Sequence, residues 1–470
     1  MGMGYEVIHT YEYGCVLYYK DFKNLEQCLM CHESRYLYGE GDRKIPRKVT
    51  PCDSEAWKEF DRKFLDFAQD ARNVRLGLAT DGFNPFGAAA LSHSTWPIVL
   101  MPYNLPPSLC MKKEFNILAM LISGLKSLEK CLNVFMQPLI EELNMLWDTR
   151  ALTFDRHSRS SFNMKVAVMW TITDFPGLGM LGGLKCKGYK ACPLCLDEID
   201  SQHLAGRMSY QGHRRWLDKD HSWRQMANKF NGEVELKDRY EGEVLLDSCE
   251  YFFRFALFGR IAQPYSLDMM HIEKNVFENI IGTILGLQGK IKDDVKAREG
   301  LEKQEIRKEL WWKKKGSSSR KAKVSQAPYT VLPNEKAEIL EFIKDAKYPY
   351  GYAGSLKNKI NVEDKKFNGL KTHDCHVLLQ RLLPVFIQPY LPHYVVEPLI
   401  SLSRQFQKLC CKELMVRDVT QMKVDIIMIL CKLEMVFPLA FFTITVHLLI
   451  HLPEQVLLKG PVHYNWMYPI

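Results

Sequence analysis

The sequence contains no apolar run long enough to cross a membrane and no apolar core of a signal peptide within residues 1–10. Its most apolar segment, residues 436–450, is too short for a bilayer and includes Pro438 and His447, so we predict a buried helix there. A nucleophile elbow, a phosphate-binding loop, a kinase signature and internal repeats are also missing. These absences argue against membrane association and against the enzyme classes that such motifs identify.

The overall composition is typical of a globular protein with a mildly basic charge. The 470 residues are enough for two or three domains, and the content is 47% hydrophobic and 25% charged. Lys and Arg number 63 against 55 Asp and Glu, which gives a net charge of +8 and is compatible with a nucleic-acid partner. Fourteen cysteines without a secretion signal indicate reduced thiols and metal ligands rather than disulfides.

Two acidic residues stand where predicted strands end. In residues 74–80 apolar side chains alternate in steps of two, which predicts a strand that stops at Asp81 and Gly82. A second apolar run over residues 165–173 ends at Asp174 and is broken by Phe-Pro-Gly. A lone acid at the end of a buried strand is well placed to hold a divalent cation. Two such acids predict a third acid and a metal nearby.

The third acid is expected from residues 268–286, whose apolar side chains recur with helical spacing. Glu273 lies within this helix, where packing can aim it at the strand ends, whereas Asp268 resembles an N-cap and is its substitute. Phosphodiester cleavage uses two metal ions about 4 Å apart, and Mg²⁺ prefers carboxylate oxygens. We therefore predict a catalytic site of Asp81, Asp174 and Glu273 that binds Mg²⁺ or Mn²⁺. The alternative is structural, because Asp-Gly after a strand is usually a turn and a helical Glu is usually solvated.

The segments around these acids resemble those of one transposon family. The stretches ATDGFNPFG, WPIVLMPYNLPPSLCMK, WTITDFPG, ACPLC, YQGHRRWL and LDMMHIEKNVFENIIGTIL are similar to the transposase of plant CACTA (En/Spm-type) DNA transposons. GLKTHDCHVLLQRLLP and KGPVHYNWMYP resemble the helical domain of unknown function that follows this transposase. The similarity covers nearly the whole chain, in the family's order.

The resemblance implies an RNase-H-like core with a DDE-type site, which cuts at terminal inverted repeats and joins the excised element to target double-stranded DNA. Matched position by position, the family's first acid is Asp81, the second is Asp174 and the third is Glu273, with Asp268 as the substitute. The resemblance further implies a plant nuclear protein that acts as a homo-oligomer or with a second protein encoded by the element.

The expected fold class is α/β, with an RNase-H-like core, a Cys/His-containing insertion and a mainly α-helical C-terminal domain. The charged, Ser-containing stretch after the core is predicted to be a linker. The expected regions are a partial Cys-containing region at 1–54, the catalytic domain at 55–290 with its insertion at about 186–262, a basic linker at 291–328 and the helical domain at 329–470.

The insertion opens with Cys192-Pro-Leu-Cys195, and a C-x2-C pair offers two thiolates from one turn to a zinc ion. His213 and His221 follow at nearly zinc-finger spacing, although the two histidines are further apart than the three to five residues usual in fingers. We predict a structural Zn²⁺ site of these four residues, with Cys186 as a substitute ligand. The alternative is buried cysteines and surface histidines.

Basic residues at two places predict DNA contacts. One group directly follows His213 and combines two guanidinium groups with a stacking ring: Arg214, Arg215 and Trp216. The other lies in the linker and indicates a nuclear localisation patch or a DNA-facing segment, with a solvated linker as the alternative: Lys313, Lys314 and Lys315.

Three further motifs have weaker signals. Cys28 and Cys31 form a second C-x2-C pair, which Cys15 or Cys52 would have to complete. Residues 177–182 fit G-x-G-x-x-G, but we expect a loop beside Asp174 rather than a dinucleotide site. The last motif is a histidine pair one helical turn apart, which we expect to be core or surface histidines rather than a zinc pair: His447 and His451.

Two functions remain from these observations. The leading hypothesis is a DDE-type transposase with metal-dependent cleavage and strand transfer. The alternative is a non-catalytic DNA-binding or zinc-stabilised interaction protein derived from a transposase. CACTA transposases generally carry more sequence on both sides, so an inactive, truncated copy is expected to look like this chain. Both hypotheses predict association with nucleic acid, and only the first predicts metal-dependent cutting.

Overall fold

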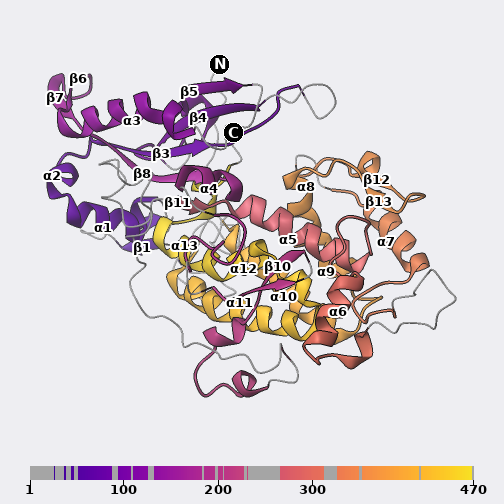
Figure 1. The fold of residues 1–470 in the computed structure, drawn as a ribbon. Coiled ribbons are helices and arrows are strands. Elements are labelled where there is room, and N and C mark those ends of the chain that lie inside the picture. The colour runs from indigo at the N-terminus through magenta and orange to yellow at the C-terminus, as the bar shows by residue number, and fades with distance from the viewer. Residues whose placement is uncertain are drawn as a thin grey trace.

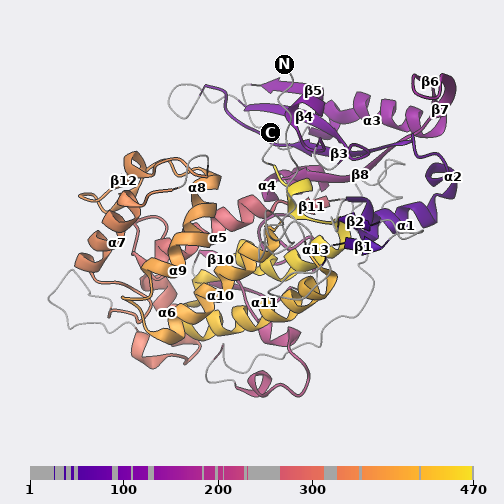
Figure 2. The same cartoon turned by 180° about the vertical axis from the view of Figure 1, so that it is seen from behind.

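A computed structural model of the chain places a β-sheet layer beside a larger helical body (Figures 1 and 2). The N-terminal half supplies four of the five strands of the sheet, and the C-terminal half forms most of the helical body. No helix among the described residues is long and apolar enough to span a bilayer. The structure describes residues 26, 36–38, 44–46, 51–86, 94–106, 109–124, 132–182, 185–195, 199–204, 206–226, 230, 265–311, 325–348, 352–411 and 414–467.

The sheet has five strands in the order β11-β8-β3-β4-β5. Strand β8 runs parallel to both β3 and β11, while β4 runs antiparallel to both β3 and β5. The two strands predicted to end in an acid are β3 and β8, and both predictions are confirmed. The bounds are β3 (Val74–Thr80), β4 (Ser94–Pro102), β5 (Ile117–Gly124), β8 (Val166–Thr173) and β11 (Tyr265–Leu267).

Strand β8 is buried along its whole length because elements cover both faces of the sheet. On one face, helix α3 (Leu132–Asp148) packs Met136 and Ile140 against Leu78 and Val168. On the other face lie α1 (Glu55–Lys63), α2 (Leu65–Ala68) and the C-terminal residues Tyr464 and Met467. The end of the described chain therefore belongs to the core of the sheet, although it is distant in sequence.

The helical body forms one apolar core together with the segment after β8. The helix predicted over residues 268–286 is α5, and Asp268 is its N-cap as expected, because its side chain accepts from the Met270 N–H. The helices of this body are α4 (Phe175–Gly182), α5 (Met269–Ile284), α6 (Val295–Lys303), α7 (Pro333–Asp345), α8 (Thr372–Val377), α9 (Leu383–Phe386), α10 (His393–Leu409), α11 (Val416–Val436), α12 (Ile444–His447) and α13 (Leu452–Lys459).

Short hairpins complete the described secondary structure. The hairpin of β9 and β10 lies in the predicted insertion and is tied to the helical body, because the Tyr210 N–H donates to the Phe442 carbonyl at 2.8 Å. The strands of these hairpins are β1 (Tyr36–Tyr38), β2 (Lys44–Pro46), β6 (Ala151–Asp155), β7 (Ser160–Met164), β9 (Ser201–Leu204), β10 (Arg207–Tyr210), β12 (Ile360–Asn361) and β13 (Lys366–Phe367).

Three local predictions are wrong in part. Residues 436–450 are buried as predicted, but Pro438 keeps the residue before it extended, so short 3-10 turns and α12 replace one helix. The first part of the predicted linker contains α6, whose buried Arg298 pairs with Asp293 and donates to the Leu310 carbonyl at 2.8 Å. The glycine-rich loop expected after Asp174 is the helix α4.

Candidate functional site

Three aspartates stand at one edge of the sheet. Asp81 directly follows β3, Asp174 directly follows β8, and Asp268 lies between β11 and α5. Because β3, β8 and β11 are parallel neighbours, their carboxyl ends lie at the same edge. The fold therefore brings together Asp81, Asp174 and the substitute acid Asp268.

The three carboxylates are close enough to affect each other's ionisation. Burial, followed by the charge of Asp174, raises the pKa of Asp81 from an ordinary 3.8 to about 6. Burial also raises the pKa of Asp174, and the charge of Asp268 adds to that shift. His271 pairs with Asp268, and that hydrogen bond raises the pKa of the imidazole. The site is a repulsive group of acids, which favours binding of a cation.

Backbone amides orient these acids. The Gly82 N–H donates to Asp81 Oδ1 at 2.7 Å, and the Gly177 N–H donates to Asp174 Oδ1 at 2.6 Å. A Cβ at Gly177 would lie 2.1 Å from Thr173 Oγ1, so the close approach of this amide to Asp174 requires glycine. No choice of one oxygen from each of the three acids brings all three within 4.8 Å of one another, so these acids are spread more widely than the ligands of a single ion.

Glu273 does not join this group. Its carboxylate is 1% exposed, lies 2.8 Å from His376 Nδ1 and accepts a 2.8 Å hydrogen bond from Gln380 Nε2. Glu273 lies five positions after Asp268 in the sequence. At about 100° per residue, its side chain is turned about 140° around the helix axis from that of Asp268. The structure thus corrects the expectation that Glu273 approaches Asp81 and Asp174, and Asp268 takes that position.

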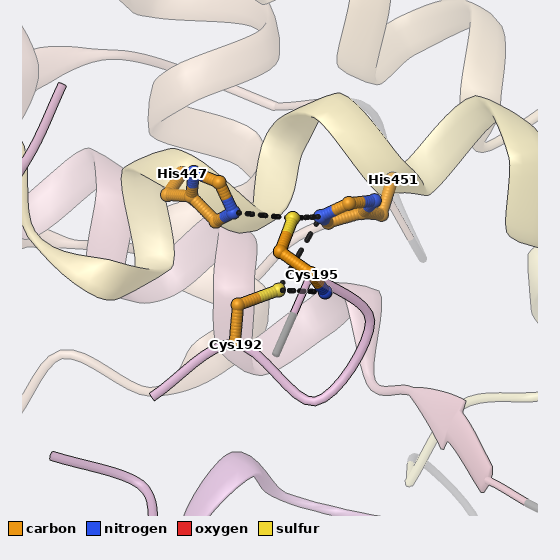
Figure 3. Close-up of side chains that lie close together, drawn as sticks. All are labelled: Cys192, Cys195, His447 and His451. Atoms are coloured by element: carbon orange, nitrogen blue, oxygen red, sulfur yellow. Dashed lines mark hydrogen bonds between the residues drawn. The ribbon is translucent and has the colours of Figure 1, made fainter. Parts of the chain in front are cut away.

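A second cluster consists of two cysteines and two histidines (Figure 3). Cys192 and Cys195 lie in the turn after α4, while His447 ends α12 and His451 ends the following 3-10 turn. Cys195 Sγ is 3.3 Å from His447 Nε2 and 3.2 Å from His451 Nε2, and Cys192 Sγ is 3.3 Å from His451 Nε2. All four side chains are buried, and their ligand atoms lie within 4.8 Å of one another.

This geometry is consistent with a structural metal. Tetrahedral Zn²⁺ with S and N ligands at about 2.3 and 2.0 Å would place each S···N pair about 3.5 Å apart, close to the observed spacing. Burial lowers the pKa of His447 to about 4, so its imidazole is neutral and able to coordinate. Burial opposes ionisation of Cys192, but the hydrogen bond with Cys195 and the neighbouring histidines outweigh it and lower the pKa of that thiol.

Two of the four predicted zinc ligands belong to this cluster, and two do not. Cys192 and Cys195 are members of the cluster, but His213 is not, because its Nδ1 pairs with Glu434 in the core. His221 instead caps a 3-10 turn by accepting from the Trp223 N–H. The substitute Cys186 is also outside the cluster, since its Sγ donates to the Phe175 carbonyl at 3.1 Å.

His447 and His451 are buried, as one of the two expected alternatives has it, but both imidazoles also contact the thiols, which makes them candidate metal ligands. The predicted ligand set took its histidines from residues close to the C-x2-C pair in sequence, whereas in the structure the histidines come from the C-terminal segment. Their spacing was a usable signal, because H-x3-H is the spacing that zinc sites combine with C-x2-C.

The predicted DNA contact after His213 is not supported by the observed packing. Arg214 is buried, lies over the Phe230 ring and donates to the Trp223 and Arg224 carbonyls. Arg215 is buried beside Asp200, and Trp216 packs against the core. The remaining predicted sites lie outside the described residues: Cys15, Cys28, Cys31, Lys313, Lys314 and Lys315.

Two protein-family models match the chain. The model described as transposase family tnp2 matches residues 47–246, and a domain of unknown function (DUF4218) matches residues 409–470. Asp81, Asp174 and the two cysteines lie in the first match, and both cluster histidines lie in the second. No curated protein matches the chain. The matched models support a transposase-type protein.

Proposed function

We propose that the chain is a DDE-type DNA transposase of a CACTA-like element, built on an RNase-H-like core. The observation that carries this proposal is the group of acids at the carboxyl ends of three adjacent parallel strands. The expected RNase-H-like arrangement has its first acid on the first strand, its second on a later strand and its third at a closing helix. Asp81, Asp174 and Asp268 follow that order, and the tnp2 match includes the first two.

In this proposal Asp81, Asp174 and Asp268 hold Mg²⁺ or Mn²⁺. The donor set fits such ions, because it consists of carboxylate oxygens whose mutual repulsion is relieved by a cation. The bound ions would supply activation of the attacking oxygen and charge stabilisation at the leaving oxygen. The Gly82 and Gly177 amides fix the orientation of two carboxylates, and His271 holds one oxygen of Asp268.

A structural Zn²⁺ at Cys192, Cys195, His447 and His451 is the second part of the proposal. Such an ion would join the segment matched by the tnp2 model to the segment matched by the C-terminal model. Its role would be to hold the helical body against the core that carries Asp81 and Asp174. Action in the nucleus on terminal inverted repeats and target DNA belongs to the same proposal, because the substrate is chromosomal DNA.

The second candidate function is a non-catalytic, zinc-stabilised DNA-binding or interaction protein derived from a transposase. One observation favours it: the ligand atoms of the two cysteines and two histidines lie within 4.8 Å of one another, whereas the three acids are spread more widely. This candidate would bind DNA without cutting it.

Cleavage of DNA that carries the terminal inverted repeats distinguishes the two candidates. With Mg²⁺ or Mn²⁺ the wild type should nick at the repeat ends, and Asp81→Asn, Asp174→Asn and Asp268→Asn should each lower the rate at least about 100-fold. Asp364→Asn is the matched control, because that exposed carboxylate pairs with Lys366 away from the sheet. Equal cutting by the Asp81 variant would refute the catalytic assignment, and binding without cutting by the wild type would favour the second candidate.

A further inference from the structure

A third group of metal-ligating side chains gathers where three helices meet. Glu273 comes from α5, His376 from α8 and Cys410 from the C-cap of α10. One ligand atom of each lies within 4.8 Å of the other two. None of the three belongs to the aspartate group or to the Cys192–His451 cluster.

The charge of Glu273 is poorly compensated in this setting. Its side chain is buried, and within the described part of the chain its one ion-pair contact is with His376 Nδ1, at 2.8 Å. A buried carboxylate is stabilised by a positive charge nearby, and a bound metal ion would supply one.

The side-chain amide nitrogen of Gln380 lies close to all three side chains. Its Nε2 lies 2.8 Å from Glu273 Oε1, 3.2 Å from His376 Nδ1 and 3.3 Å from Cys410 Sγ. His376 Nδ1 either donates to Glu273 or accepts from Gln380, and it cannot do both. With the proton on His376 Nδ1, this nitrogen donates to Glu273, and the two N–H groups of Gln380 donate to Glu273 and Cys410. An ion bound by the three side chains would therefore displace the Gln380 amide, which contacts all three of them.

We propose that Glu273, His376 and Cys410 bind a divalent zinc-like ion that joins α5, α8 and α10. A carboxylate oxygen, an imidazole nitrogen and a thiolate sulfur are all zinc ligands, and the mixed set excludes Mg²⁺, which takes oxygen ligands. On binding, the Cys410 thiol loses its proton to solvent, and His376 coordinates as neutral imidazole through Nδ1. The Glu273 carboxylate and the Cys410 thiolate then carry two negative charges, which balance the two positive charges of the ion.

The site has a structural consequence for α5. The same helix begins at Asp268 and carries His271 one turn later, so an ion at Glu273 would fix the helix that presents the aspartate group. Binding of this ion does not depend on DNA cleavage. A failure of the transposase proposal would therefore leave the metal site standing, and the reverse also holds.

Metal content of the purified full chain tests the site. After dialysis against zinc-free buffer, the wild type should retain one zinc ion at each of the two compact clusters of the described residues. Cys410→Ser should retain about one zinc ion fewer than the wild type, and Cys411→Ser should retain as much zinc as the wild type. Cys411 is the matched control, because it is the adjacent residue and its exposed thiol donates to the Gln407 carbonyl instead.

A second variant protects the test against misfolding. Glu273→Gln keeps the shape of the side chain and removes its charge, so it should also retain about one zinc ion fewer than the wild type while circular dichroism stays unchanged. Cobalt substitution supplies an independent reading, because a Cys410–Co²⁺ bond adds thiolate charge-transfer absorption that Cys195→Ser alone does not abolish. Wild-type protein with one zinc, or a Cys410 variant with unchanged zinc, would overturn the proposal.

Discussion

Cys195 and His451 are 256 residues apart in the sequence, yet Cys195 Sγ lies 3.2 Å from His451 Nε2. The first residue belongs to the segment matched by the tnp2 model and the second to the segment matched by the C-terminal model. The two segments also share one apolar core, so the contact is part of a large packed interface rather than an isolated bridge. A metal ion here would couple folding of the C-terminal segment to folding of the core.

Replacing Cys195 should remove this coupling. We expect Cys195→Ser to lose the zinc of this cluster and to lower the free energy of unfolding by about 3–5 kcal/mol, because loss of a structural metal is among the largest single-site effects. Cys186→Ser should change neither quantity, since that thiol lies outside the cluster. Zinc analysis and urea unfolding measure both effects. Full zinc retention by the Cys195 variant would contradict the ligand assignment.

Replacing the histidines separates ligands from core residues. His451→Ala should lose zinc. His213→Ala should keep it and still lower stability by about 3–5 kcal/mol, because Glu434 would be left buried without its partner. His221→Ala should have little effect on either measure, since it removes one cap of a short turn. Zinc analysis and thermal unfolding measure the zinc content and the stability of the three variants. If His213→Ala lost the zinc and His451→Ala kept it, the ligand set expected from sequence would be restored.

Local sequence patterns predicted the parts of the site that local structure decides. Period-two alternation located β3 and Asp81, and an apolar run that stops at an acid located β8 and Asp174. Helical spacing and N-cap chemistry located α5 and Asp268. The direction of Glu273 also follows from helical geometry, because five residues place it on another side of α5 than Asp268.

The features that the sequence did not predict depend on packing between segments distant in the chain. His447 and His451 meet the two cysteines only because the C-terminal segment packs on the turn after α4. Arg214 and Arg215 are residue types that often contact phosphates. In the fold, however, Arg214 lies over an aromatic ring and Arg215 pairs with a carboxylate. The H-x3-H spacing marks His447 and His451 as candidate ligands, but no pattern in the sequence shows that they meet Cys192 and Cys195 or which groups the two arginines contact.

The pH dependence of stability tests the aspartate group. In metal-free protein Asp81 has a pKa of about 6 against an ordinary 3.8, so between these pH values the folded state binds more protons than the unfolded state. The free energy of unfolding should therefore fall as pH rises from about 4 to 6, and stay low above 6. Asp81→Asn should remove this decrease and stabilise the metal-free protein at pH 8 by about 1–2 kcal/mol, a value reduced for partial screening by solvent.

Denaturant unfolding at pH 4 and pH 8 measures this difference. Mn²⁺ should restore stability to the wild type at pH 8 and should have a smaller effect on Asp81→Asn. Asp364→Asn is again the control, because it removes an exposed carboxylate outside the group. An Asp81 variant with the same pH profile as the wild type would show that burial and the neighbouring acids do not raise the pKa of Asp81.

Gly77 tests how the C-terminal segment is attached to the sheet. A Cβ at this position of β3 would lie 2.5 Å from Tyr103 Oη and 2.7 Å from its ring. That hydroxyl donates to the Tyr464 carbonyl at 2.8 Å and accepts from Trp170 Nε1 at 2.9 Å, so displacement of the ring breaks both hydrogen bonds. We expect Gly77→Ala to cost about 1–3 kcal/mol in unfolding free energy and to expose the end of the chain to proteolysis. Gly354→Ala is the control, because nothing lies within 4 Å of its Cβ.

Tyr103→Phe removes only the hydroxyl and should lower the free energy of unfolding by about 1 kcal/mol. Equal losses for Gly77→Ala and Tyr103→Phe would show that the hydrogen bonds, and not the close packing of β3 on the ring, hold this segment.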